Sequence, residues 1–224
     1  MPLDFPNIKI ARSKFGLKRN QAAFESEFSR KISIHCHAGG KTDRWEGLYT
    51  TPTLSLADVR VFRSFITQLK GQIGTFKAFN PDKKLPSTYV QANLTGDSTT
   101  VSADDTTNTV DSGSFPGAGK VNGASQSGRS LITKDWPASS TVLKAGDHIQ
   151  VETRFFMVTA DVVSDVNGAV TINIEPPLRE SPADNAQVVT KNPVLIARLV
   201  NPILQIETGP ITGGPYSFAF EEVL

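Results

Sequence analysis

The sequence predicts a mainly β protein with one helix, in which a second β-rich domain interrupts the first. Short runs of alternating apolar and polar residues recur along most of the chain, whereas residues 55–70 have helical spacing. The charge also changes along the chain. Residues 1–86 carry 15 Lys and Arg against 7 Asp and Glu, residues 87–196 carry 7 against 12, and residues 197–224 carry 1 against 3. This asymmetry indicates separate surfaces that face separate neighbours.

The composition indicates a soluble globular protein and excludes several classes. With 224 residues, 38% of them hydrophobic and 13 of them Phe, the chain can bury a packed core. A formal net charge of +1 argues against binding nucleic acid by bulk electrostatics. The single cysteine, Cys36, excludes an internal disulfide and a four-cysteine zinc site. The sequence has no apolar run of the roughly 18 residues that a membrane helix needs and no apolar signal-peptide region after Met1, so we expect synthesis in the cytoplasm.

The helix is predicted over residues 55–70. Apolar residues recur there at spacings of three and four and form one stripe: Leu56, Val59, Phe62, Phe65, Ile66 and Leu69. Ser55 is a suitable N-cap, with Asp58 three residues later as a capping-box partner. Gly71 is a natural stop after the last turn. The stripe is wide enough to pack on a sheet, so we interpret it as core rather than as a ligand-binding face.

Strands are predicted over most of the rest of the chain. In the first part they cover residues 30–37, 44–50 and 73–79, with Ile32, Ile34 and Cys36 on one face of the first strand. In the second part they cover residues 148–152, 154–163, 169–174, 188–189 and 194–199. So many short strands at this spacing predict that residues 87–196 form a small β-barrel (OB-like) or a β-sandwich of their own.

His35, Cys36 and His37 are the residues most like a metal site. On a strand the two histidines point to one side and the cysteine to the other, so the three cannot ligate one ion. A closed zinc site needs four ligands, and the other histidine of the chain, His148, lies in the other domain. We therefore expect no bound metal, with an ion shared across an oligomer axis as the alternative.

Other segments that could carry chemistry lack the required spacing. Residues 117–120 resemble the end of a phosphate-binding loop, but Val121 stands where that loop has Ser or Thr. Residues 123–127 lack the closing glycine of a nucleophile elbow, and Asp104 with Asp105 lacks the spacing of a calcium loop. We expect no cofactor and no enzyme activity. Glycan cleavage by two separated carboxylates is an alternative that the sequence leaves open.

A series of motifs follows one order along most of the chain. In the first part they are residues 24–29, residues 44–47, the helix at 55–70 and the run from 74 to 82. Residues 128–131, 135–137, 143–147, 174–179 and 191–193 continue the series, and residues 216–222 end it with alternating aromatic residues. In this order the motifs resemble the distal tail proteins of long-tailed (siphovirus-like) bacteriophages. The first twenty residues match that family least well.

This resemblance implies a structural protein of the virion. Distal tail proteins form hexameric rings that join the tail tube to the hub or baseplate, and the genome is ejected through the ring. Residues 1–86 with 197–224 would form the ring-forming belt domain, a β-sandwich with the helix, and residues 87–196 the inserted domain. The implied partners are further copies of the chain, the tail tube protein and the hub or baseplate proteins, without sequence-specific nucleic acid or a membrane segment. Assembly would take place in the host cytoplasm.

The resemblance and the alternation together predict the core of the belt domain. The expected core residues are Phe24, Phe28, Ile32, Ile34, Trp45, Val59, Phe62, Phe65, Ile66, Leu69, Phe76, Phe218 and Phe220. The alternative function is a receptor- or carbohydrate-binding module that holds a bacterial surface glycan. Such a module needs exposed aromatic residues, and the inserted domain has Tyr89, Phe115, Trp136, Phe155 and Phe156, most of which we expect in its core.

Overall fold

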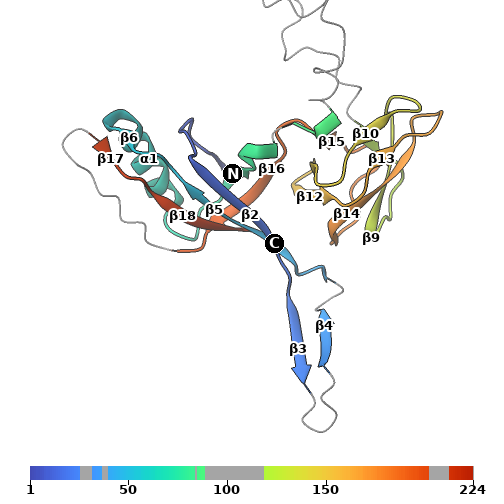
Figure 1. Ribbon diagram of the computed structural model, residues 1–224, viewed down its shortest axis with the longest axis horizontal. Coiled ribbons are helices and arrows are strands. Elements are labelled where there is room, and N and C mark those ends of the chain that lie inside the picture. Colours follow the sequence, from blue (N-terminus) through green and yellow to red (C-terminus); the bar gives the residue numbers. More distant parts are fainter. Residues whose placement is uncertain (26–31, 37–39, 84, 89–118, 202–211, 224) are drawn as a thin grey trace, which may run out of the picture. The chain divides into compact units, whose positions relative to one another are not determined.

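The structure is a computed structural model that describes residues 1–25, 32–36, 40–83, 85–88, 119–201 and 212–223; of residues 21–25, 32–36, 83 and 212 it describes the backbone alone. It is mainly β, with the helix α1 (Leu56–Leu69). The chain divides into two units (Figure 1). Unit 1 comprises Met1–Asp82 and Val194–Leu224, and unit 2 comprises Lys83–Pro193. The units therefore begin and end a few residues before the expected boundaries at 86/87 and 196/197.

Unit 1 is built on a six-stranded sheet that contains strands from both ends of the chain, drawn in blue and red in Figure 1. Its order is β1-β7-β16-β18-β5-β2. The strands are β1 (Leu3–Asp4), β2 (Arg12–Lys18), β5 (Arg44–Thr50), β7 (Phe76–Phe79), β16 (Val194–Leu199) and β18 (Ser217–Glu222). β1 runs parallel to β7, and the other neighbours are antiparallel. Because the central strands β16 and β18 follow unit 2 in sequence, the sheet needs both parts of the chain.

Short elements flank this sheet in the described part of unit 1. β3 (Gln21–Glu25) and β4 (Ile32–Cys36) form an antiparallel hairpin with Gln21 opposite Cys36. β6 (Leu54–Ser55) pairs with β17 (Thr212–Gly213) beside α1 (Figure 1). A 3-10 turn, η2 (Pro81–Lys83), follows β7. The strand expected at residues 30–37 is thus described over Ile32–Cys36, and the rest of that range lies outside the described residues.

The ends of α1 follow from its sequence. The Oγ of Ser55 accepts a hydrogen bond from the Asp58 N–H at 3.2 Å and donates one to Asp58 Oδ2 at 2.7 Å, so Ser55 caps the first turn. At the other end Lys70 takes a left-handed conformation, with φ 48° and ψ 46°, directly before Gly71. The helix therefore spans Leu56–Leu69, one residue shorter at each end than the expected 55–70.

An aromatic core joins α1 to the sheet of unit 1. The Phe62 and Phe218 ring centroids lie 5.6 Å apart, as do those of Phe65 and Phe76. Phe5, which directly follows β1, lies within ring-contact distance of Tyr49, Phe65, Phe76, Phe79 and Phe218. The first twenty residues thus supply part of this core.

A glycine makes room for one of these rings. On β5, Gly47 lies opposite Phe15 of β2 and Phe220 of β18. A Cβ atom on Gly47 would lie 2.3 Å from Phe220 Cζ, and the Phe220 side chain is fully buried. The absence of a side chain at Gly47 therefore allows the Phe220 ring to approach the strand closely.

The positions of the predicted core residues are as follows. Trp45, Val59, Phe62, Phe65, Leu69, Phe76, Phe218 and Phe220 are buried, and Ile66 is half-buried. The side chains of Phe24, Ile32 and Ile34, and the whole of Phe28, lie outside the described residues. The strand expected at residues 73–79 begins only at Phe76, because the Gly74 N–H bonds back to Leu69 O at 2.8 Å and keeps Ile73 in a turn.

Unit 2 is a nearly closed β-barrel. Its main sheet has the order β15-β11-β12-β14-β9-β8. The strands are β8 (Lys120–Val121), β9 (Gly128–Lys134), β11 (His148–Val151), β12 (Arg154–Val158), β14 (Val170–Leu178) and β15 (Val188–Val189). The two edges meet, because the Val121 N–H donates to Ala186 O at 2.9 Å and the Val188 N–H to Gly119 O at 2.8 Å. A second sheet of unit 2 consists of β10 (Thr141–Leu143) and β13 (Val162–Val163). The single strand expected at 154–163 is therefore two strands, because β12 ends at Val158 and Val162–Val163 pair with β10 instead.

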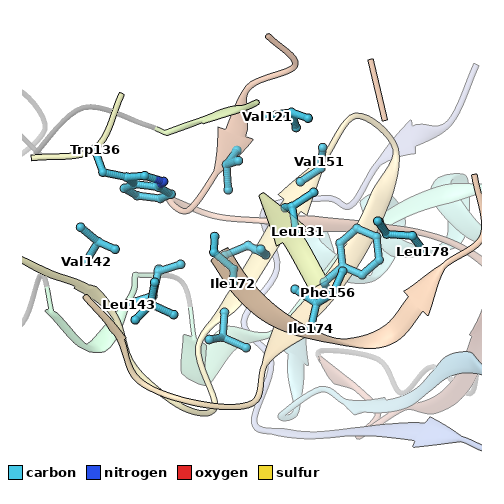
Figure 2. Packing of buried hydrophobic residues seen from close by; sticks show 14 residues of the cluster. Val121, Leu131, Trp136, Val142, Leu143, Val151, Phe156, Ile172, Ile174 and Leu178 are labelled. Carbon is cyan, nitrogen blue, oxygen red and sulfur yellow. The ribbon is translucent and has the colours of Figure 1, made fainter. Parts of the chain in front are cut away.

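One hydrophobic cluster fills the barrel (Figure 2). Trp136 lies at one side of it, near Val142 and Leu143. The Trp136 Nε1–H donates to Thr133 Oγ1 at 2.7 Å, so its single polar atom is satisfied although the side chain is buried. A Cβ atom on Gly119 would lie 2.0 Å from the indole, so the chain passes close against this ring.

Candidate functional site

The insertion point in the unit 1 sheet is the best defined candidate site, because both connections to unit 2 start from neighbouring strands of that sheet. β7 precedes unit 2 and β16 follows it, and the two strands are antiparallel neighbours in the unit 1 sheet. Phe79, the last residue of β7, lies directly opposite Val194, the first residue of β16. Unit 2 is therefore inserted at one point of the sheet, where the two chain ends lie side by side as an inserted domain requires.

Tyr49 fixes the end of β7 from inside the core. Its hydroxyl accepts a hydrogen bond from the Phe79 N–H at 2.8 Å and donates one to Phe79 O. The side chain is fully buried, and burial raises the pKa of Tyr49 well above its usual range, although the bond to Phe79 partly opposes this. The hydroxyl therefore keeps its proton and serves as a permanent donor at the residue from which the chain leaves the sheet.

Asp147 holds the chain where it enters unit 2. Its Oδ1 accepts from the Ser87 N–H at 2.9 Å and from Ser87 Oγ at 2.6 Å, and its Oδ2 accepts from the Lys144 N–H at 2.8 Å. Thr88 adds a bond from Oγ1 to Val142 O at 2.9 Å. The Asp147 carboxylate is fully buried and uses both oxygens, so it acts as a structural anchor.

A charged cluster crosses three neighbouring strands of the unit 1 sheet. Glu221 on β18 accepts hydrogen bonds from Arg44 on β5 at 3.2 Å and from the Arg198 Nη2 on β16 at 2.8 Å. Burial alone would raise the pKa of Glu221, but the hydrogen bond and charge of Arg198 and the charge of Arg44 outweigh it, so its pKa lies below the ordinary value. The cluster ties the two strands that follow unit 2 to a strand that precedes it.

The described residues that the sequence analysis considered for a phosphate or metal site make packing contacts or ion pairs with other residues of unit 2. Gly119 packs against Trp136, and Lys120 lies in β8 with its Nζ 3.0 Å from Asp135. His148 is buried in β11 with its ring 4.9 Å from that of Phe155. His37, Asp104 and Asp105 lie outside the described residues, as do the side chains of His35 and Cys36. In the described part of the chain no group of three or more His, Cys, Asp or Glu could hold a metal ion.

The aromatic residues of unit 2 bear on the carbohydrate-binding alternative. Trp136, Phe155 and Phe156 are all buried, so their rings do not offer a flat surface to a sugar. Tyr89 and Phe115 lie outside the described residues. No described aromatic side chain of unit 2 therefore favours glycan binding.

Sequence reasoning missed the two residues that hold the chain before and after it leaves the unit 1 sheet. Tyr49 and Asp147 drew no attention as hydrogen-bonding groups, since the partners of both come from distant parts of the chain. Asp147 had one visible signal, because it is a charged residue between Gly146 and a strand, a position where a carboxylate can accept backbone N–H bonds.

Neither a protein-family model nor a curated protein matches the chain significantly. Within the described ranges, the structure has no helix of the length and apolar character needed to cross a membrane.

Proposed function

We propose that the protein is a structural component of a bacteriophage tail tip, where six copies form a ring that joins the tail tube to the hub or baseplate and surrounds the genome-delivery channel. One observation carries this proposal: a helix-bearing sheet is interrupted, between the neighbouring strands β7 and β16, by a β-barrel. This arrangement agrees with the belt domain and inserted domain that the order of motifs implies.

The polar contacts inside both units suit a structural component. Within unit 1, Tyr49 fixes the end of β7 and the cluster around Glu221 links strands from both ends of the chain; within unit 2, Asp147 holds the first residues of the unit. Such satisfied polar contacts keep one geometry within each unit, which a ring of identical copies requires of its subunits.

Opposite charges on different segments support assembly of many copies. Residues 1–86 and 197–224 together have a net charge of +6, whereas residues 87–196 have a net charge of −5. Opposite potentials steer protomers into register and raise the association rate, while apolar burial supplies most of the affinity. We therefore expect the rate of ring formation from dilute monomer, followed by light scattering, to fall as salt rises, while rings already formed persist. A rate that does not depend on salt would remove this electrostatic support.

Mass measurement tests the ring directly. Native mass spectrometry of the purified full chain should give six times the chain mass of 24.2 kDa, and negative-stain electron microscopy should show a ring with an open centre. A protein that stays monomeric at every concentration tested, or that forms closed particles without a channel, would overturn the proposal. Unit 1 is the expected ring-forming part, so a chain that lacks unit 2 should still form rings.

A further inference from the structure

We infer that Asn122 is a site of spontaneous deamidation, through which the closure of the unit 2 barrel changes as the protein ages. An asparagine followed by glycine favours this reaction, because glycine has no Cβ atom to hinder the approach of its backbone nitrogen. The sequence Val-Asn-Gly-Ala occurs twice, at residues 121–124 and 166–169. The two copies share the same local chemistry, so the surroundings of each copy in the fold decide which one reacts. The inference does not depend on the proposed ring.

The reaction takes place within the chain and needs water as its co-reactant. The backbone nitrogen of Gly123 attacks Cγ of Asn122 and forms a bond to it, while the side-chain nitrogen leaves as ammonia with the proton of the Gly123 N–H. Water then opens the resulting succinimide ring at either carbonyl. Opening at Cγ gives aspartate, and opening at the backbone carbonyl gives isoaspartate, in which the main chain runs through Cβ and Cγ. The first step requires the glycine N–H to leave its hydrogen bond.

The second copy of the sequence is held by backbone groups of the barrel. The Gly168 N–H donates to Asp165 O at 3.1 Å, and Gly168 O accepts from the Trp136 N–H at 3.0 Å. Gly168 is buried, and a Cβ atom on it would lie 2.2 Å from Trp136 O, so its backbone packs closely. Asp165 Oδ1 also accepts from the N–H groups of Asn167 and Ala169, both at 2.8 Å. The Gly168 nitrogen can therefore reach the exposed Asn167 side chain only when this turn opens.

The first copy is held at its glycine by two side chains. The Gly123 N–H donates to Asp184 Oδ1 at 2.8 Å, and Gly123 O accepts from Gln126 Nε2 at 3.1 Å. The Asp184 side chain is 46% exposed, so it can turn into solvent without movement of a strand. No described atom lies within 4 Å of a Cβ atom placed on Gly123, so this residue has room to move toward the exposed Asn122 side chain. Freeing the Gly123 nitrogen thus disturbs less of the fold than freeing that of Gly168.

Asp184 is the group that slows the reaction at Asn122. The bond from the Gly123 N–H is the main cause that lowers the pKa of Asp184 below its ordinary value, and the charge of Lys134 adds to it. The carboxylate is therefore charged at neutral pH and is a strong acceptor for this N–H. While the bond lasts, the Gly123 nitrogen is held away from the reaction.

The place of Asn122 in the barrel gives the modification a structural effect. Val121, the residue before it, closes the barrel: its N–H donates to Ala186 O at 2.9 Å, and its O accepts from the Asn185 N–H at 3.0 Å. The Val121 side chain also belongs to the hydrophobic cluster (Figure 2). Isoaspartate at residue 122 lengthens the main chain directly after these contacts. The edges of the barrel should therefore open more often in aged protein.

Peptide mapping of the full chain tests the site. The protein is incubated at mildly alkaline pH and digested, and mass spectrometry follows the replacement of the amide by a carboxyl group in each Asn-Gly peptide. In the folded protein Asn122 should react about tenfold faster than Asn167 or more, because less of the fold must open. In protein unfolded by urea the two should react at the same rate. Equal rates in the folded protein, or a faster reaction at Asn167, would overturn the inference.

Variants test the two structural steps. Asp184→Ala should speed the reaction at Asn122 several-fold and leave Asn167 unchanged, whereas a slower reaction at Asn122 would show that Asp184 does not restrain it. Hydrogen exchange of the peptide that contains β8 should become faster with age in the wild type. The rise should persist in the matched control Asn167→Gln and be absent in Asn122→Gln. The same rise in Asn122→Gln would refute the link between Asn122 and barrel closure.

Discussion

Adding one methyl group at Gly47 should destabilise unit 1, whereas the same change at Gly16 should not. The two glycines lie on the neighbouring strands β5 and β2, one register position apart. A Cβ atom at residue 47 would lie 2.3 Å from Phe220 Cζ and 2.8 Å from Lys14 O, well inside the 3.5–4.0 Å of an ordinary carbon contact. At Gly16 nothing lies within 4 Å of the added atom.

The pair of variants isolates the cost of the clash. Phe220 cannot move aside, because its ring is fully buried. The centroid of that ring lies 5.4 Å from the centroid of the Phe15 ring and 4.7 Å from that of the Tyr49 ring. Overpacking of this kind costs about 1–3 kcal/mol. Replacing glycine by alanine also reduces the entropy of the unfolded chain, which stabilises by about 0.4–1 kcal/mol, but this gain is common to both variants. Their free energies of unfolding should therefore differ by about 1–3 kcal/mol.

Urea unfolding followed by near-ultraviolet circular dichroism measures this difference, because the buried aromatic side chains of unit 1 contribute to the signal beside those of unit 2, and only the unit 1 transition should differ between the two variants. Gly16→Ala should unfold at the same or a higher urea concentration than the wild type, and Gly47→Ala at a lower one. Equal stability of the two variants would show that Phe220 does not pack against Gly47 as the structure describes.

Three further changes test other parts of unit 1. Phe62→Ala should lower the free energy of unfolding by about 3–5 kcal/mol, because the ring is fully buried. Arg63→Ala, at an exposed position, should lower it by under about 0.5 kcal/mol. Thermal unfolding measures both, and equal effects would contradict the packing of α1. Glu221 has a lowered pKa when folded, so its charge stabilises the fold above the ordinary pKa of 4.5 and this contribution is lost as the pH falls through the folded value. Glu221→Gln should therefore lose stability at neutral pH and show a flatter acid limb in pH-dependent unfolding, and an unchanged limb would contradict it. Replacing residues 83–193 by a short turn should leave unit 1 folded, because β7 and β16 are still paired. Residues 1–86 alone should be insoluble or unfolded, because β7 then lacks its partner β16. A stable monomer of residues 1–86 would contradict the insertion.

Local patterns in the sequence predicted the parts of the fold that depend on neighbouring residues. The apolar stripe of α1, the Ser55 cap and the mainly β character follow from spacing and from side chains within a few positions of each other. The barrel of unit 2 could be expected because its strands alternate regularly, and the structure has a barrel in place of the alternative sandwich.

Features that depend on distant contacts could not be read from the sequence. β1 has two residues and takes its strand character from pairing with β7, about seventy positions along the chain, so no local period reveals it. Ile73 suggested an earlier start for β7 because it is apolar, yet the hydrogen bond of Gly74 to the end of α1 places it in an exposed turn. The roles of Tyr49 and Asp147 depend likewise on which backbone groups the fold brings to them.

The placement of β16 and β18 at the centre of the unit 1 sheet has a consequence for synthesis. During translation, unit 2 is a continuous segment that is finished before these two strands leave the ribosome, so it can fold while β5 and β7 still lack their partners. The aromatic side chains that form the core of unit 1 lack their partners until residues 217–222 arrive, since Phe218 and Phe220 close that core. The first part of this chain to be made is therefore the last to reach its native state, and slowing translation after unit 2 would lengthen the time during which it can aggregate.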